Sequence, residues 1–484
     1  MKFKSILIFG LLLLNLFNSV ITGGAGDFNG INLTRGFKDI KNHNPVMTQK
    51  FSADPGVMEY NGRLYVYSTN DGYLQTNIPA KNVYSKINEL NIMSTSDMVN
   101  WVDHGTIKVA GNGGIARWAG NSWAPTAAHK VINGRERFFL YFANNANGIG
   151  VLVSDSPTGP WSDPIGRPLI SRSTPNCNVE WLFDPAVFVD NDGNGYLYFG
   201  GGVPAGKQSN PQTIRAVKLG WDMISLAGNV VNINAPWVFE DSGIHKLGNT
   251  YYYSYCTNWS GGPYGNARIG YMTSNSPLGP FTFKGTCFNN PSDFFGTPGN
   301  NHHTIIAFKN VLYIFYHAEW LNKQSYGSQL GYRTTHVDVM PVSGSNLGNA
   351  KGTLTGVSQL HSFNPYVLNY FNTMAWEAGI NVYGTGNPVV SYNRGDWTGI
   401  ARVDFGTLAK SITVEAGSAN GATIRVAIGS PTGSTIGFVT IPPTGGAFKY
   451  KKVTAPIMDK ATGVKNLFFI ASADVVLNTF QFSK

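Results

Sequence analysis

The first residues of a repeated pattern recur along this chain at intervals of roughly 60 residues, and four of the five have side chains capable of acid–base chemistry. Asp54, Trp123, Asp184, Glu240 and His302 each open a segment with an alternating strand, a turn and a second strand rich in Tyr and Phe. Two carboxyl groups facing one cleft can hydrolyse a glycosidic bond, because one protonates the leaving oxygen while the other activates water. A third carboxylate can keep the acid protonated through like-charge repulsion. Asp54, Asp184 and Glu240 supply that number.

The repeated strand–turn–strand unit predicts a β-propeller, whose blades surround a central channel. Because the innermost strands of successive blades line this channel, corresponding positions converge on its axis. We therefore expect Asp54, Asp184, Glu240 and His302 to meet at one channel mouth. The long stem of Glu240 suits a general acid, and the short Asp54 suits a fixed base. For His302 two interpretations stay open, a metal ligand and a neutral hydrogen-bond donor.

The stretch DNDGNG at 190–195 resembles the first half of a calcium-binding EF-hand loop. Such a loop needs a Glu six residues after its last Gly, and this chain has Gly201 there. The flanking stretches PAVFV and YLYF alternate like strands. We therefore predict a hairpin turn here and no calcium site.

Composition and the first residues indicate an exported protein that handles sugars. Residues 1–23 have the pattern of a secretory signal peptide, in which two lysines precede a short apolar run and small residues. We expect no membrane-spanning segment in the mature chain. The net charge is +9, but the basic residues are scattered, which argues against nucleic-acid binding. Aromatic residues are as frequent as charged ones, 13% each, which favours surfaces that stack on sugar rings.

The predicted fold is all-β, with a five-bladed propeller followed by a β-sandwich of the jelly-roll type. The propeller is predicted over residues 24–355, where the repeats lie. From residue 372 to 484, short alternating strands are separated by turns rich in Gly and Pro, without a helical period. The three cysteines form no zinc-binding pattern, and their odd number leaves at least one thiol free. The oligomeric state is left open.

Three stretches of the first domain resemble the acidic blade motifs of glycoside hydrolase family 43. They are SADPGVMEYNGRLYVYSTND, WLFDPAVFVDNDGNGYLYFGGG and PWVFEDSGIHKLGNTYYYSY, and the likeness extends over roughly residues 40–340. The resemblance implies a five-bladed propeller and an inverting mechanism. It implies that Asp54 is the general base and Glu240 the general acid, and that Asp184 orients the acid and tunes its pKa.

The same resemblance implies residues that bind the substrate and a cation. Trp123 in SWAPT matches a motif that lines the sugar subsite, and Arg333 in GYRTTH matches a basic residue that contacts the bound sugar. His302 in NNHHTII matches a histidine beside a cation on the propeller axis, often Ca²⁺, with His303 as the alternative.

The C-terminal domain resembles a family 6 carbohydrate-binding module in WEAGI, YNRGDWTGIARVDFG, IGSPTGSTIG, PPTGG and TFQF. Glu377 matches an acidic residue that commonly binds structural Ca²⁺, and Tyr450 and Tyr392 lie at or near positions of sugar-stacking aromatics. The chain departs from the pattern at Val476 and Asn478, where many members carry a sugar-binding Asn and an Asp.

These observations favour a secreted hydrolase acting on plant cell-wall polysaccharide, namely xylan, arabinoxylan and their oligosaccharides. The main prediction is a β-xylosidase with α-L-arabinofuranosidase activity. The alternatives are an arabinoxylan-debranching or arabinan-degrading hydrolase and, with less support, a non-catalytic carbohydrate-binding protein. A sucrose or fructan enzyme on a similar propeller is a further candidate, but its motifs are not found here.

Overall fold

The computed structural model describes residues 27–74, 77–259, 262–458 and 460–484, so the predicted signal peptide lies outside the described residues. The chain divides into two compact units. The larger unit comprises residues 41–98 and 103–358, and the smaller comprises 99–102, 359–484 and the described residues up to 40. Within the described ranges no helix combines the length and the apolar character needed to span a membrane.

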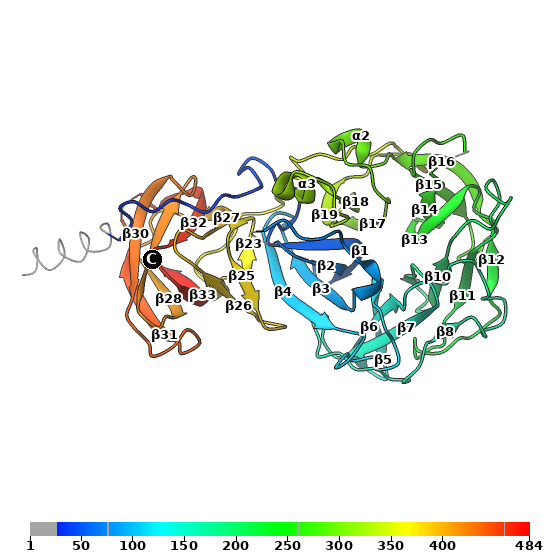
Figure 1. The fold of residues 1–484 in the computed structure, drawn as a ribbon, viewed down its shortest axis with the longest axis horizontal. Helices are drawn as coiled ribbons and strands as arrows, with labels where there is room; N and C mark the ends of the chain where they lie inside the picture. The colour runs from blue at the N-terminus through cyan, green and yellow to red at the C-terminus, as the bar shows by residue number, and fades with distance from the viewer. Residues whose placement is uncertain (1–26, 75–76, 260–261, 459) are drawn as a thin grey trace, which may run out of the picture. The chain divides into compact units, whose positions relative to one another are not determined.

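Five sheets with three or more strands each make up most of the larger unit, and Figure 1 shows them arranged around a common centre. The first sheet contains β1 (Lys50–Tyr60), β2 (Arg63–Tyr73), β3 (Glu89–Thr95) and β4 (Trp101–Lys108). The second contains β5 (Trp123–Ile132), β6 (Arg135–Ala143), β7 (Gly148–Ser154) and β8 (Ile170–Ser171). The third contains β9 (Ala186–Val189), β10 (Gly195–Gly200), β11 (Ile214–Lys218) and β12 (Val231–Ile233). The fourth contains β13 (Val238–Leu247), β14 (Thr250–Thr257), β15 (Ile269–Ser274) and β16 (Thr282–Phe288). The fifth contains β17 (His303–Phe308), β18 (Val311–Ala318) and β19 (Thr334–Val339).

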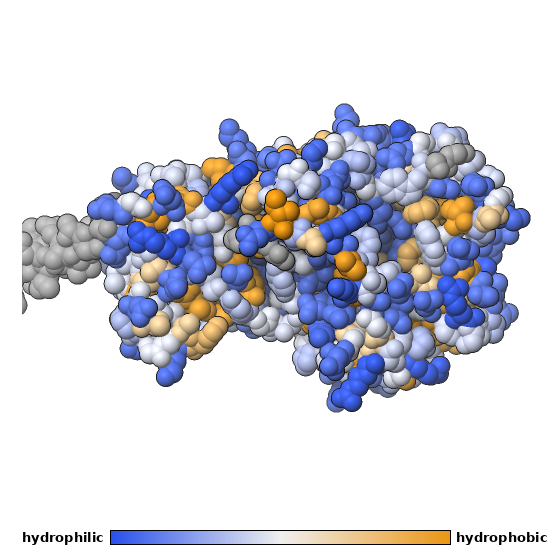
Figure 2. Space-filling view, viewed as in Figure 1, coloured by the Kyte–Doolittle hydropathy of each residue, from blue (hydrophilic) through white to orange (hydrophobic). Residues whose placement is uncertain are grey.

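Short elements connect or follow these sheets. They are the 3₁₀ turn η1 (Tyr84–Lys86), the helices α2 (Ser292–Phe295) and α3 (Trp320–Tyr326), and the strands β20 (Val342–Ser343) and β21 (Asn346–Leu347). The DNDGNG stretch forms the turn between β9 and β10, as predicted. On the face shown in Figure 2, apolar side chains form separate patches among polar and charged ones.

The five innermost strands enclose a central channel. Each of β1, β5, β9, β13 and β17 contacts the next, and β17 contacts β1 again. Inside them lies a cavity of about 320 Å³, which all five strands line. Its wall includes Gly56, Thr126, Val187, Ile244 and Thr304. This arrangement agrees with the predicted five-bladed propeller, and it explains why strand starts far apart in sequence meet at one mouth.

Hydrogen bonds close the ring between the first and last blades. The backbone N–H of Val46 donates to the carbonyl of Thr335 (2.9 Å), and that of Ser52 donates to the carbonyl of Arg333 (2.8 Å). The Thr335 hydroxyl returns a bond to the carbonyl of Ser52 (2.7 Å). The segment that leads into β1 is therefore fastened to β19, and Arg333 is fixed at the same place.

A local backbone feature repeats in four inner strands. Asp54, Ala124, Asp184 and Asp241 all have a left-handed conformation, with φ of 50°, 42°, 49° and 67°. In β1, β5 and β13 the strand register shifts at this position, as expected for a β-bulge. The sequence repeat predicts Trp123 and Glu240 in the same phase as Asp54. The structure corrects this by one residue. Ala124 and Asp241, not Trp123 and Glu240, have the backbone conformation of Asp54.

The smaller unit is a β-sandwich. One sheet has the order β25 (Asn381–Tyr383), β26 (Val389–Tyr392), β33 (Val475–Ser483), β28 (Ser411–Gly417), β31 (Lys451–Pro456), and β22 (Asn369–Tyr370) also pairs with β33. The other has the order β24 (Trp376–Ala378), β27 (Trp397–Asp404), β32 (Val464–Ala471), β29 (Ala422–Ile428), β30 (Ser434–Ile441). A two-residue strand, β23 (Thr373–Met374), precedes β24. The core between the sheets is apolar, including Ile412, Val414, Phe469 and Phe480. This confirms the predicted sandwich.

Residues 27–40, which we call the N-terminal strap, belong to the sandwich unit. The Thr34 hydroxyl donates to Asp396 (2.6 Å), and the Trp397 indole donates to the carbonyl of Thr34 (2.9 Å). Phe28 and Leu33 pack against the apolar cluster that includes Trp397. The predicted propeller range of 24–355 includes these residues. Their sequence shows no strand pattern from which their packing against the sandwich could be predicted.

Candidate active site

One pocket of about 570 Å³ brings together the propeller residues singled out from the sequence. Asp54, Trp123, Asp184, Glu240, His302 and Arg333 all line it. Nδ1 of His302 lies 3.6 Å from Asp54 Oδ1 and 3.8 Å from Asp184 Oδ2. The predicted convergence of residues from four blades is therefore present in the structure.

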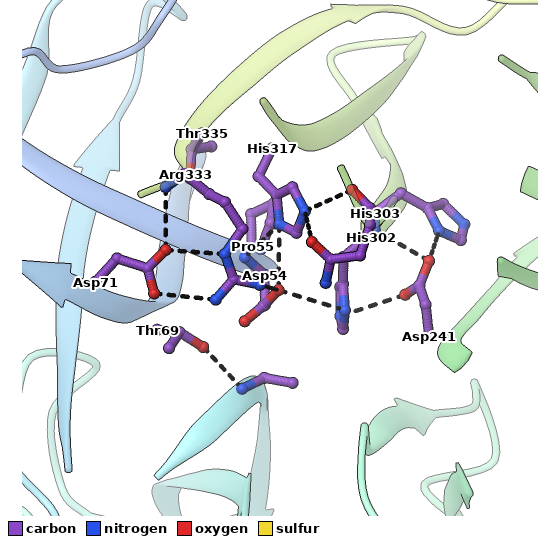
Figure 3. Close-up of polar contacts among 12 residues, drawn as sticks. Asp54, Pro55, Thr69, Asp71, Asp241, His302, His303, His317, Arg333 and Thr335 are labelled. Atoms are coloured by element: carbon purple, nitrogen blue, oxygen red, sulfur yellow. Dashed lines mark hydrogen bonds and ion pairs between the residues drawn. The ribbon is translucent and has the colours of Figure 1, made fainter. Parts of the chain in front are cut away.

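Arg333 links Asp54 to a carboxylate that no sequence motif marks (Figure 3). Its Nε and one terminal nitrogen donate to the two oxygens of Asp71 at 2.8 and 2.9 Å, and the other terminal nitrogen donates to Asp54 Oδ1 at 2.8 Å. Such bidentate pairing fixes both the position and the plane of the guanidinium. All three side chains are buried, so the ion pairs are weakly screened by solvent.

The surroundings of Asp54 favour its ionised form. Burial alone would raise the pKa of this carboxyl group, but the charge of Arg333, followed by the contacts with His302 and His317, lowers it well below its usual range. His317 Nδ1 also accepts the backbone N–H of Asp54 at 3.0 Å, and its Nε2 lies 3.0 Å from the Asn300 carbonyl. Asp54 is thus a rigidly held carboxylate.

The surroundings of Glu240 and Asp184 favour their protonated forms instead. Burial and the negative charges of Asp54 and Asp241 raise the pKa of Glu240 to about 8. Burial, followed by the charge of Glu240, raises the pKa of Asp184 well above its usual range. Close carboxyl groups resist double ionisation, so this pair retains a proton at neutral pH. The pocket therefore holds one ionised carboxylate and one carboxylic acid, as acid–base hydrolysis requires.

Asp241 contacts Asp184, His302 and His303. Its backbone N–H donates to Asp184 Oδ2 (3.0 Å), and its Oδ2 pairs with His303 Nδ1 (2.5 Å). Its Oδ1 lies 3.3 Å from His302 Nε2. Because His303 Nε2 is bonded to the Ser254 hydroxyl (2.7 Å), His303 is engaged below the pocket. Of the two neighbouring histidines, His302 is the one that lines the pocket.

Aromatic side chains form much of the pocket wall. Tyr84, Trp123, Trp181, Phe239 and Trp259 line it, and they come from several blades. The Trp123 indole donates to the carbonyl of Tyr84 (3.0 Å), and the Arg333 guanidinium lies 4.8 Å from the centre of the Tyr84 ring. Flat apolar rings around a charged centre suit a sugar, which presents both C–H faces and hydroxyl groups.

Several residues in and around the pocket are not predicted by the sequence motifs, namely Asp71, Asp241, His317, Asn300, Tyr84 and Glu319. One signal was available for Asp241, because EDSG repeats the form of ADPG and FDPA in the blade motifs. The others lie on second strands and loops, where no repeat marks them. Only their placement in space shows that they belong to one site.

The donor set beside His302 fits a directly chelated Ca²⁺ poorly. Ca²⁺ takes six to eight oxygen ligands. Across the described part of the chain, no group of three or more His, Cys, Asp or Glu side chains is placed to hold a metal ion. Burial lowers the pKa of His302, so its ring is neutral at pH 7 and close to three carboxyl groups. The cation beside His302 that the family resemblance implies stays a prediction.

Predicted residues of the sandwich unit fall in different environments. Tyr392 is buried and its hydroxyl bonds to Thr398 (2.7 Å), so the ring has no face for a sugar, which speaks against the predicted stacking role. Tyr450 is half-buried. Glu377 is buried close to Lys38. Burial lowers the pKa of Lys38 to about 8, and the negative charge of Glu377 offsets part of that shift. A nearby ammonium group opposes a cation at Glu377, so the fit to Ca²⁺ is poor here too.

Both units match known families. Residues 42–342 match the glycosyl hydrolases family 43, and residues 372–484 match the carbohydrate binding module of family 6. The arabinoxylan arabinofuranohydrolase of Bacillus subtilis (strain 168) is 44% identical over 473 residues, covering 92% of this chain and 92% of the relative. The arabinoxylan arabinofuranohydrolase of Paenibacillus polymyxa is 44% identical over 455 residues, covering 89% of this chain and 72% of the relative.

Solved structures agree with these matches. A crystal structure of a family 43 arabinoxylan arabinofuranohydrolase from Bacillus subtilis, in complex with cellotetraose, has a TM-score of 0.89 at 42% identity. It covers 93% of this chain and 99% of that chain. An α-L-arabinofuranosidase from Clostridium thermocellum has a TM-score of 0.51 at 38% identity, covering 65% of this chain and 98% of that chain. All four of these similar proteins are named for arabinofuranose, whereas the main prediction from the sequence is a β-xylosidase.

Proposed function

Since the chain belongs to glycoside hydrolase family 43, we propose that it is an arabinoxylan-debranching enzyme that releases arabinofuranose side chains from the xylan backbone. The observation that carries this proposal is the likeness, over 92% of both chains, to an enzyme named arabinoxylan arabinofuranohydrolase. It supports the debranching alternative over the main sequence-based prediction of β-xylosidase activity. The pocket supplies the acid, the base and the aromatic wall that such a reaction needs.

In the proposed mechanism, Asp54 accepts a proton from a water molecule that attacks the anomeric carbon of the bound arabinofuranose. Glu240 donates its proton to the glycosidic oxygen, so the bond to the xylose unit breaks as the bond to water forms. Asp184, held by the Asp241 N–H, keeps the acid in place and helps to keep it protonated. The single displacement inverts the configuration at the anomeric carbon.

Other residues prepare these two groups. Arg333 keeps Asp54 ionised and stationary, and His302, neutral at pH 7, lies between Asp54 and Asp184. Trp123 and Tyr84 offer ring faces to the sugar. We further propose, from residues 1–23 alone, that the enzyme is exported, which would place it with a polymeric substrate.

The proposal is tested with the purified full-length mature chain on wheat arabinoxylan, linear xylo-oligosaccharides, debranched arabinan and paired aryl glycosides. We expect L-arabinose from arabinoxylan, no shortening of the xylan backbone, and a preference for aryl α-L-arabinofuranoside over aryl β-D-xyloside of roughly 100-fold or more. Proton NMR of the first product should show inversion. Xylose release from linear oligosaccharides as the dominant activity would overturn the proposal in favour of a β-xylosidase.

The same assays with and without EDTA address the cation predicted beside His302. Since the donor set is poor, we expect less than a twofold change. A large loss that Ca²⁺ restores would instead establish the cation that the family resemblance implies.

A further inference from the structure

The pocket contains a fourth carboxylate that the proposed reaction does not use. Glu319 lines the same cavity as Asp54 and Glu240, and it is only 9% exposed. Glu319 immediately precedes α3, yet its side chain makes no capping hydrogen bond to that helix. Shorter polar side chains at this position, such as Asp or Ser, normally turn their oxygen towards the free N–H groups of the first turn. In this protein the side chain is turned towards the pocket wall instead.

Only one of its two oxygens is engaged by the protein. Oε2 accepts the backbone N–H of Gly331 at 3.0 Å. Oε1 has no hydrogen-bond partner among the described residues, and it lies against Gly299, where an added Cβ atom would come within 3.2 Å of it. Because Gly299 also lines the cavity, a glycine leaves Oε1 open towards the cavity.

No positive charge neutralises Glu319 directly. Within the described residues, no lysine, arginine or histidine nitrogen forms an ion pair with it, and the guanidinium of Arg333 is committed to Asp71 and Asp54. Burial raises the pKa of Glu319. Oε1 of Glu319 faces the cavity without a protein donor among the described residues, so it is an acceptor available to a ligand that enters the pocket.

We propose that Oε1 of Glu319 accepts a hydrogen bond from a hydroxyl group of the arabinofuranosyl residue in the pocket, which makes Glu319 a specificity-determining residue. This inference rests on the proposed debranching function. Because Glu319 is nine-tenths buried, the group that enters the pocket reaches it, whereas the xylan backbone stays at the rim. Glu319 therefore selects the sugar that is released.

The test compares Glu319→Gln with the wild-type enzyme on aryl α-L-arabinofuranoside and on arabinoxylan. The glutamine keeps the shape and a carbonyl acceptor for Gly331, but offers an amide in place of Oε1. We expect kcat/KM to fall roughly 10- to 100-fold, by the same factor on both substrates and mainly through KM, because the contact forms already in the bound substrate. Glu136→Gln, which removes a carboxylate paired with His129 outside the pocket, is the matched control and should leave both substrates unaffected.

Three aryl arabinofuranosides that each lack one hydroxyl group identify the contact. One of them should be a poor substrate for the wild-type enzyme and yet lose nothing further in Glu319→Gln, because both changes remove the same hydrogen bond. Unchanged kcat/KM in Glu319→Gln would overturn the inference, as would a loss confined to the polymer. Equal further loss on all three deoxy substrates, with a lowered melting temperature, would overturn it in favour of a purely structural role. A wild-type enzyme without arabinofuranosidase activity would refute the proposed function first, so the two failures are distinguishable.

Discussion

The propeller pocket and the sandwich core treat buried polar groups in opposite ways. At the pocket the chain buries Asp54, Asp184, Glu240 and Asp241 almost completely, close enough for their charges to interact. The sandwich core consists of aliphatic and aromatic side chains, and the hydroxyl of its buried Tyr392 has a hydrogen-bond partner. Burying carboxyl groups together costs stability, whereas apolar burial contributes to it. The difference indicates that the pocket is arranged for chemistry and the core for cohesion.

The carboxyl groups of the pocket differ in pKa because different charged groups surround them. Asp54 faces Arg333, whose charge lowers its pKa, while burial, followed by the negative charges of Asp54 and Asp241, raises the pKa of Glu240 to about 8. Two side chains with the same functional group thereby take different protonation states at one pH.

The largest effect is expected from Glu240→Gln. This change removes the proton donor but keeps the side-chain shape, so turnover of arabinoxylan should fall roughly 1,000-fold or more, with binding retained. Aryl arabinofuranosides with a good leaving group need little protonation and should lose about 10-fold or less. Steady-state kinetics on both substrates measures the ratio.

Asp54→Asn is the matched variant, because the base is needed whatever the leaving group is. It should abolish turnover of both substrates. Equal losses on both substrates in Glu240→Gln would contradict the general-acid role and would remove the contrast between the two carboxyl groups.

The pH dependence of kcat/KM is the next largest effect. Glu240 acts only when protonated, so its raised pKa keeps activity through neutral pH, and activity should fall as the pH rises through about 8. Asp54 acts only when ionised, and its lowered pKa should move the acidic limb below the ordinary range of aspartate. In Glu240→Gln, assayed on an activated aryl substrate, the alkaline limb should disappear. An alkaline limb that persists in that variant belongs to another group.

The smallest effect is expected in the sandwich core. Tyr392→Phe removes a buried hydroxyl group and its bond to Thr398, which should lower the free energy of unfolding by about 1 kcal/mol. Calorimetry should show a lower melting transition, with arabinoxylan turnover and polysaccharide retention unchanged. Reduced retention without a change in melting would restore Tyr392 as a sugar contact.

The repeat made much of the propeller predictable from the sequence. The strand starts carried Asp54, Asp184, Glu240 and His302, and the geometry of a closed ring placed them together. The sequence did not show which residue of each repeat occupies the equivalent position in the strand. A β-bulge shifts that position from Glu240 to Asp241 without altering the alternating pattern. Asp71 and Glu319 lacked any periodic signal.

The substrate was harder to predict than the fold. Xylose and arabinofuranose are pentoses of similar size, so the same pair of carboxyl groups can act on either sugar. The discriminating contact that we propose, Glu319, lies outside the repeated blade motifs. In the sandwich unit the sequence marked Tyr392 as an aromatic at a binding position. Burial alone distinguishes it from exposed rings such as Tyr383 and Phe448, whose centres lie 6.1 Å apart.

The N-terminal strap has a consequence for the order in which the protein is made. Residues 27–40 leave the ribosome more than 300 residues before Trp397 and Phe468, against which Phe28 and Leu33 pack. Throughout synthesis of the propeller, the strap has no partner for its apolar side chains. A chain ended before the sandwich would keep those side chains exposed permanently. A fragment designed to fold should therefore contain both residues 27–40 and the sandwich, or lack both.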